Sequence, residues 1–209
     1  MARKTGDRNR DFEQKREQIL DALQGRLLSE DAPRISMHEM ATVAGCSLSS
    51  LRHHFGSRPN LYAALLARYG GVGKRYHDKI RAPVDQPVKE SLAEFLRLLV
   101  IGLRRGVLDI HAVGLAVGMR DDVVGPAYLR EILEPMLQAV EQRLAHHQQR
   151  GELRDVNLRI AALSLVSPVL VAALHQQGLF GAAVRPLSLD DLCAELLQSF
   201  LRAHATTSD

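Results

Sequence analysis

The sequence predicts an all-α protein with an N-terminal three-helix helix-turn-helix domain, a larger C-terminal helical bundle and about nine helices in total. Apolar residues recur at helical spacing in almost every segment, and no alternating strand pattern of useful length and no internal repeat occurs. Prolines, glycines and serines stand between the apolar segments, where helices begin and end. Of the 209 residues, 46% are hydrophobic, which is enough to build a substantial core.

The first two helices are defined by their ends. The first helix presents one apolar face and ends before Pro33, which cannot continue it. Ser36 begins the second helix, because a serine followed three residues later by Glu39 forms a capping box. Gly45 suits the left-handed turn that breaks this helix. The apolar face of the first helix consists of Phe12, Arg16, Ile19, Leu20, Leu23 and Leu27.

The third and fourth helices follow at once. Ser47 caps a very short helix that runs to about His54. Ser57 caps the fourth helix, whose first turn accepts Pro59. Three glycines lie in the middle of the fourth helix, and we expect a kink or an early end there because glycine weakens helices. These are Gly70, Gly71 and Gly73.

Charge and proline divide the chain in two. Residues 1–82 hold 15 Lys and Arg against 9 Asp and Glu, whereas residues 83–209 hold 12 against 15. Pro83 and Pro87 mark the boundary between these two expected domains. A basic N-terminal part is typical of a module that binds a polyanion, although chance clustering explains the charge about equally well.

The C-terminal helices are longer. A helix that starts at Gly125 continues to Gly151, with a bend at Pro135. Residues 160–174 form a helix that is apolar nearly all round, so we expect two buried faces. Ser188 caps the last helix. We expect its apolar stripe and residues 160–174 to pair across a two-fold axis with the same two helices of a second copy, in a four-helix dimer interface. The stripe residues of this interface are Leu189, Leu192, Leu196 and Phe200.

Composition narrows the class of protein further. Aromatic residues make up only 4% and tryptophan is absent, which argues against an aromatic-rich sandwich. Two cysteines, Cys46 and Cys193, cannot build a disulfide framework or a four-cysteine zinc site, and they favour a reducing compartment. The N-terminus lacks the apolar stretch of a secretory signal, and residues 160–174 are short for a membrane span. We therefore expect a cytoplasmic protein without a membrane partner.

Residues 36–55, SMHEMATVAGCSLSSLRHHF, carry the most informative pattern. Two short helices meet at a tight turn that contains glycine, and the small Ala41 lies where they would cross. This is the spacing of a helix-turn-helix, whose second helix enters the major groove of DNA, although many helical pairs mimic it. The outward residues of the second helix are Leu48, Ser49, Ser50, Arg52, His53 and His54.

The longer context resembles the N-terminal domain of the TetR family of transcriptional regulators, over about residues 15–66. The resemblance implies a homodimeric repressor whose subunits each have a three-helix DNA-binding domain and a helical ligand-binding domain. Arg52 stands where the family commonly has an aromatic residue, and Arg58 where it has lysine. The matching segments are residues 19–23, 35–41, 44–51 and 54–61.

The expected DNA contacts divide between phosphates and bases. Ser36 and Ser57 would place helix N-termini against phosphates, with plain capping as the alternative. Arg52 and Arg58 would pair with phosphate oxygens. Serines read bases poorly, so DNA shape would contribute to recognition. The candidate DNA-binding residues are Ser36, Ser47, Leu48, Ser49, Ser50, Arg52, His53, His54, Ser57 and Arg58. Arg3, Lys4, Arg8 and Arg10 would form a minor-groove arm or a merely soluble tail.

The C-terminal domain is expected to hold a small, largely apolar effector, because polar or soft groups are scattered among its apolar helices. An ordinary core or surface position explains each of these residues better when it is taken singly. The pair His146 and His147 would lie at the surface and is not expected to chelate a metal, and no cofactor is expected. The candidate pocket residues are Phe95, Leu99, His111, Met119, Tyr128, Met136 and Leu165.

Two other functions compete with a ligand-responsive regulator. One is a protein that coats DNA without sequence preference. The ratio of affinities for an operator and for random DNA would distinguish it from a regulator. The other is an enzyme on a helical bundle, which the motifs disfavour. His38 and Glu39 are not followed by the second histidine of a zinc-protease motif, because Thr42 occupies its place. No phosphate-binding loop or nucleophile elbow occurs, so we expect no enzymatic activity.

Overall fold

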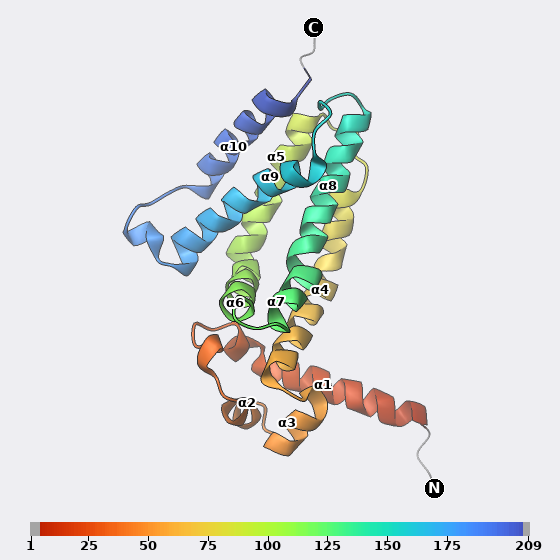
Figure 1. The fold of residues 1–209 in the computed structure, drawn as a ribbon, viewed down its shortest axis with the longest axis vertical. Helices are drawn as coiled ribbons and strands as arrows, with labels where there is room; N and C mark the ends of the chain where they lie inside the picture. The colour runs from red at the N-terminus through yellow and green to blue at the C-terminus, as the bar shows by residue number, and fades with distance from the viewer. Residues whose placement is uncertain (1–4, 207–209) are drawn as a thin grey trace.

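The computed structural model describes residues 5–206, and for residues 5–9 it describes the backbone only. The described residues are helical, as predicted, and contain no β-strand; Leu153 and Ala205 form one isolated bridge. Figure 1 shows α1 to α3 at one end, with the long α4 rising from them into the larger bundle. The helices are α1 (Thr5–Leu27), α2 (Met37–Val43), α3 (Leu48–Phe55), α4 (Arg58–Arg81), α5 (Val88–Gly102), α6 (Leu108–Gly118), α7 (Val124–Tyr128), α8 (Glu134–Gln149), α9 (Leu158–Ala173) and α10 (Leu189–His204).

Local signals in the sequence fix the starts of α2, α3 and α4. The Ser36 hydroxyl accepts from the Glu39 amide at 3.2 Å, and the Glu39 carboxylate accepts from the Ser36 amide at 2.8 Å, which completes the expected capping box. The Ser47 and Ser57 hydroxyls cap α3 and α4 by accepting from the Ser50 and Asn60 amides. Gly45 has a φ of +60°, the left-handed conformation that the turn between α2 and α3 requires.

The expected kink in α4 is wrong, because the helix runs unbroken over 24 residues. Close packing against residue 131 explains why residue 70 is a glycine. A Cβ atom on Gly70 would lie 2.6 Å from the carbonyl oxygen of Glu131, so only glycine allows α4 to approach this segment so closely. Packing against α7 and α8 along most of its length offsets the weak helix propensity of the glycines.

Two hydrophobic cores follow each other along α4. The upper core joins α5, α8, α9 and α10. The lower core joins α1 to α4 with residues of α6 and α7. The predicted boundary between residues 82 and 83 falls in the connection from α4 to α5, yet α6 and α7 pack with the N-terminal helices. The α6 and α7 members of the lower core are Ile110, Val113, Val117, Val124, Ala127 and Tyr128.

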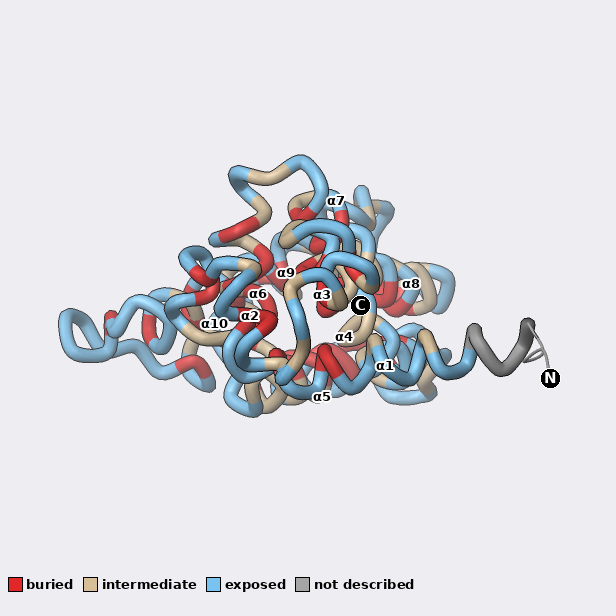
Figure 2. Tube along the Cα trace, turned by 90° about the horizontal axis from the view of Figure 1, so that it is seen from below, coloured by how far each residue is buried: buried red, intermediate tan, exposed pale blue. Residues whose placement is uncertain are grey.

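Figure 2 shows buried positions where helices pack, whereas residues 10–18 of α1 are mostly exposed. α9 and the π-helical turn after it form one helix over Leu158–Gly178, with a mean hydropathy of 1.8. This helix has the length and composition to cross a membrane, a criterion that core helices also meet. Its contacts with α8 and α10 make it a core helix of the bundle.

A buried polar network joins α4, α5 and α8, and it corrects the prediction that His147 lies at the surface. Arg143 is buried and donates from Nε to the Ile80 carbonyl at 2.7 Å and from Nη1 to the Ser91 hydroxyl at 3.1 Å. His147 is fully buried, with Nε2 2.9 Å from the Ser91 hydroxyl and Nδ1 2.8 Å from Glu152. Each buried polar group is thereby satisfied, as a closed interior requires.

Candidate nucleic-acid interface and ligand cavity

The exposed face of α3 is narrow and polar. Ser49, Arg52 and His53 are exposed, and their spacing places them on one side of the helix. The opposite side, with Leu51 and Phe55, is buried in the lower core. A helix with small polar side chains outward and no bulky apolar group can enter the major groove.

Three exposed serines cap the helices of this domain. Ser36, Ser47 and Ser57 are exposed and stand at the N-termini of α2, α3 and α4. Each hydroxyl oxygen accepts from a backbone amide of its own helix. The hydroxyl hydrogens of Ser36 and Ser57 can therefore still donate to a phosphate oxygen, whereas the Ser47 hydroxyl also lies 2.9 Å from that of Ser49.

Leu48, Ser50 and His54 of the predicted interface are half-buried. Leu48 packs against the lower core, which leaves only part of its side chain outward. His54 faces α1, and its ring centroid lies 4.6 Å from that of Phe12. Burial lowers the pKa of His54, so its imidazole is neutral at neutral pH. The prediction that His54 points outward toward DNA is therefore wrong, because α1 covers it.

Arg58 has an internal partner. Its Nη2 donates to the carbonyl oxygen of Ala32 at 2.9 Å, and its guanidinium stacks over the Tyr62 ring at 5.3 Å. The Tyr62 hydroxyl donates to the same carbonyl. Arg58 thus ties α4 to the turn before α2, and its half-buried guanidinium faces the protein rather than a phosphate.

Of the predicted N-terminal arm, Arg3 and Lys4 lie outside the described residues. Arg8 belongs to the part of α1 whose side chains are not described. Arg10 is exposed on α1. The arm stays a prediction.

A cavity of about 570 Å³ lies among α4, α5, α6 and the segment that leads into α8. Its size is that of pockets for small organic ligands, about 300–1,000 Å³. Most of its wall is apolar, with a few histidine and tyrosine side chains. The lining residues are Tyr69, Gly70, Val72, Gly73, Tyr76, His77, Leu98, Leu99, Gly102, Arg105, Val107, Ile110, His111, Glu131, Ile132 and Met136.

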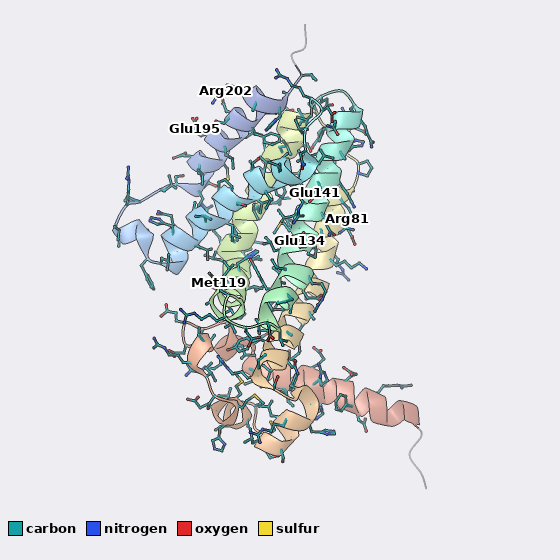
Figure 3. All side chains as sticks on the ribbon, in the orientation of Figure 1. Arg81, Met119, Glu134, Glu141, Glu195 and Arg202 are labelled. Carbon is teal, nitrogen blue, oxygen red and sulfur yellow. The ribbon has the colours of Figure 1, made fainter. Side chains whose placement is uncertain are left out.

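The cavity includes three of the predicted pocket residues, Leu99, His111 and Met136. Tyr128 lies behind the wall and contacts His111. Phe95 and Leu165 are buried in the upper core and do not line the cavity. Met119 is 81% exposed at the end of α6 (Figure 3), so its prediction as a pocket residue is wrong. It directly follows Gly118, the last residue of α6.

The α4 contribution was missed, although the sequence held a signal for it. Gly70 and Gly73 lie three residues apart and therefore on one side of α4, where they leave room for the cavity. Tyr69, Tyr76 and His77 surround this glycine surface. The low helix propensity of these glycines predicts a break in α4, and this prediction does not point to the residues around them.

The buried histidines of the cavity wall, and the buried tyrosines in and behind it, are uncharged at neutral pH. Burial lowers the pKa of His111 to about 4, and it lowers the pKa of His77 as well. Burial raises the pKa of Tyr76 and of Tyr128 to about 12. The His111 Nδ1 atom lies 2.8 Å from the Tyr128 hydroxyl, a hydrogen bond that joins α6 to α7.

Solved structures match this arrangement across nearly the whole chain. A TetR-family transcriptional regulator from Pseudomonas syringae superposes with a TM-score of 0.66 at 22% identity, covering 93% of this chain and 98% of that one. SmeT, a repressor from Stenotrophomonas maltophilia, superposes with a TM-score of 0.66 at 21% identity, covering 92% and 91%. The chain has the TetR-family fold.

A comparison of sequences also identifies a related regulator. The regulator AlkX of Mycobacterium tuberculosis, of the helix-turn-helix type, is 28% identical over 133 residues, which are 62% of this chain. The match spans 60% of the length of that regulator. No protein-family model matches the chain.

In this TetR fold, the predicted dimer residues of α10 face partly inward. Leu189 and Phe200 are buried in the upper core, and Leu192 and Leu196 are half-buried against it. The α10 stripe packs mainly on α5 and α9 of its own chain, while Glu195 and Arg202 lie on the outer side of the helix (Figure 3). Exposed apolar residues occur instead on α9 and in the connection to α10. These are Ile160, Leu163, Val171, Leu179, Phe180, Val184 and Leu187.

Proposed function

We propose that the chain is a ligand-responsive transcriptional regulator, not an enzyme, that binds a palindromic operator as a homodimer and is released from it by a small apolar effector. The observation that carries the proposal is the exposed polar face of α3, together with the exposed capping serines Ser36, Ser47 and Ser57 of α2, α3 and α4. The TetR fold and the relation to AlkX support it. A repressor of this kind acts in the cytoplasm, where it meets DNA.

Recognition of DNA by this face would combine two modes. Arg52 and the serine hydroxyls would contact phosphates, which position α3 without reading sequence. Ser49 and His53 offer few hydrogen bonds to base edges, so sequence-dependent DNA shape would contribute. Arg58 would act indirectly, by holding the start of α4 against the turn before α2.

The coupling between effector and DNA would run through α6 and α7. Both helices share the lower core with α1 to α4, and α6 also forms one wall of the cavity. A ligand that binds one arrangement of α6 more tightly shifts the protein toward that arrangement by its differential affinity. A triclosan complex of SmeT and a choline complex of a regulator from Saccharomonospora viridis have the same fold, which supports a ligand role for the cavity.

The dimer interface would lie on α9 rather than on the buried side of α10. Ile160 is 65% exposed and Val171 63% exposed, and half-buried Leu192 and Leu196 of α10 extend this surface. Pairing across a two-fold axis would bury these side chains and hold two α3 helices about 34 Å apart, one turn of DNA.

A single substitution tests the interface on α3. Genomic footprinting in the host identifies an operator, and a mobility-shift titration measures the affinity of Ser49→Glu for it. The added charge would face phosphates and base edges, so we expect a loss of roughly tenfold to a hundredfold. Gln149→Glu adds the same charge at an exposed position on α8 and should bind like the wild type. A folded Ser49→Glu variant with wild-type affinity would contradict the proposal.

The alternative of a protein that coats DNA without sequence preference makes a different prediction. It would bind operator and random DNA with similar affinity and a similar salt slope, because phosphate contacts dominate such binding. A specific regulator distinguishes the two DNAs by several orders of magnitude.

A further inference from the structure

The charged groups of the cavity wall do not favour a charged ligand. Two of the lining residues have side chains of the charged types, Glu131 and Arg105. Glu131 pairs with Arg130 at 2.8 Å, and Arg105 is exposed to solvent. An ion buried in the cavity would therefore lose its hydration without gaining a buried partner of opposite charge, which is costly. The cavity favours a neutral ligand.

His111 is a buried polar residue, and only one of its two ring nitrogens has a hydrogen-bond partner among the described residues. Its side chain is buried, with a relative exposure of 1%, and it forms part of the cavity wall. Nδ1 is bound to the Tyr128 hydroxyl at 2.8 Å. Nε2 has no hydrogen-bond partner within residues 5–206, although a buried imidazole in a closed core normally has both nitrogens satisfied.

The direction of the hydrogen bond between His111 and Tyr128 decides whether Nε2 is a hydrogen-bond donor or acceptor. If Nδ1–H donated to the tyrosine oxygen, the Tyr128 hydrogen would be left without an acceptor in the interior, because this hydroxyl has no second partner among the described residues. If the Tyr128 hydroxyl donates to Nδ1, its hydrogen is satisfied and the neutral ring carries its proton on Nε2. The second arrangement leaves Nε2–H as an unsatisfied donor at the cavity wall, in addition to the Tyr76 hydroxyl, which is buried without a partner among the described residues.

We propose that the cavity selects a neutral, largely apolar compound that carries a hydrogen-bond-accepting oxygen, and that His111 Nε2–H is the donor that recognises this oxygen. Tyr128 is the positioning residue that fixes the tautomer. The inference rests on the proposed function in treating the ligand as the effector, but it concerns binding to the cavity alone. It also places the recognition atom on α6, the helix that joins the cavity to the lower core.

A matched pair of probes tests the proposal on the purified full chain. Prodan, a neutral fluorescent naphthyl ketone, reports occupancy without interference from tryptophan, because the chain has none. Acetylnaphthalene and isopropenylnaphthalene then compete with prodan; they share shape and size, and only the first has an acceptor oxygen. One hydrogen bond should make acetylnaphthalene bind roughly threefold to tenfold more tightly.

Variants of His111 assign this preference to one atom. In His111→Phe the preference for acetylnaphthalene should disappear, whereas His111→Gln should retain it, because the glutamine amide nitrogen can donate from a position near Nε2. Gly102→Leu should weaken binding of both probes, since Gly102 lines the cavity and a Cβ there meets only Val107 at 3.7 Å. Thermal unfolding verifies that each variant is folded, and the glutamine variant carries the test if His111→Phe is not.

Three results would overturn the inference. Equal affinity of the two probes in the wild type, or a preference that survives in His111→Phe, would remove the donor role of His111. Tighter binding of naphthoate than of either neutral probe would show that the cavity selects an anion. Since the assay contains no DNA, a chain that fails to bind any operator but discriminates between the probes would refute the proposed function and support the ligand class.

Discussion

Protonation of His111 should make the stability of the protein depend on pH in a way that one variant can isolate. Burial lowers the pKa of this residue from 6.5 to about 4 in the folded state. The unfolded chain therefore binds a proton more readily than the folded chain between these two values. The contribution of neutral His111 to the free energy of unfolding is complete above about pH 6.5 and is lost as the pH falls toward 4.

The magnitude follows from the two pKa values. Each unit of difference corresponds to about 1.4 kcal/mol, so the full effect is about 3 kcal/mol, and most of it is lost by about pH 4.5. The other buried histidines, such as His77 and His147, contribute in the same direction but do so in both proteins of a comparison. The difference between the wild type and His111→Gln removes their contribution.

Urea unfolding followed by circular dichroism measures this difference at neutral pH and at about pH 4.5, at one protein concentration because dimerisation also affects stability. We expect the wild type to lose about 2–3 kcal/mol more than His111→Gln between the two conditions. An equal loss in both proteins would refute the reasoning, because it would mean that His111 is hydrated or free to move in the folded state.

Three further predictions follow from packing and exposure. Arg58→Ala should lower the free energy of unfolding by about 1–2 kcal/mol through the lost bond to the Ala32 carbonyl, and should leave the salt slope of DNA binding unchanged; a slope reduced by one phosphate contact would contradict the internal role. Gly70→Ala should destabilise the protein because its Cβ would overlap the carbonyl oxygen of Glu131. Gly71→Ala places its Cβ in open space and should stabilise α4 by up to about 1 kcal/mol. Denaturant titration measures the free energy of unfolding of both variants, and equal effects would contradict this prediction. Val171→Glu should yield a folded monomer in sedimentation experiments, and a dimer would place the interface elsewhere.

Features that depend on neighbouring residues could be predicted from the sequence. The capping box of Ser36 and Glu39 involves two residues three positions apart, and the turn at Gly45 depends on one residue's conformational freedom. The apolar periodicity likewise identified the helices of both domains. For this reason the all-α class, the helix-turn-helix and the exposed positions Ser49 and Arg52 agree with the structure.

Features that depend on distant residues could not be predicted. Arg58 finds its acceptor 26 residues away at Ala32, and His54 finds its ring partner on α1. Residue type alone marks both as polar and therefore as candidates for DNA. Similarly, the α10 stripe is apolar whichever partner covers it, and only the structure shows that Leu189 and Phe200 pack inside the chain.

The glycines of α4 illustrate the same limit in another form. Their low helix propensity was the only information available locally, and it predicted a break. The tertiary structure reverses the conclusion, because Gly70 allows close packing on the segment before α8 and leaves space for the cavity. Propensity is a weak guide when a helix is packed on several sides.

In the proposed function, the α3 face binds DNA in a sequence-specific manner as part of a dimer. The most direct measurement is the ratio of affinities of the purified chain for its footprinted operator and for random DNA of the same length, at physiological salt. The account predicts a ratio of at least about a thousand, with protection of two half-sites one helical turn apart. A ratio near one, with uniform protection, would contradict it.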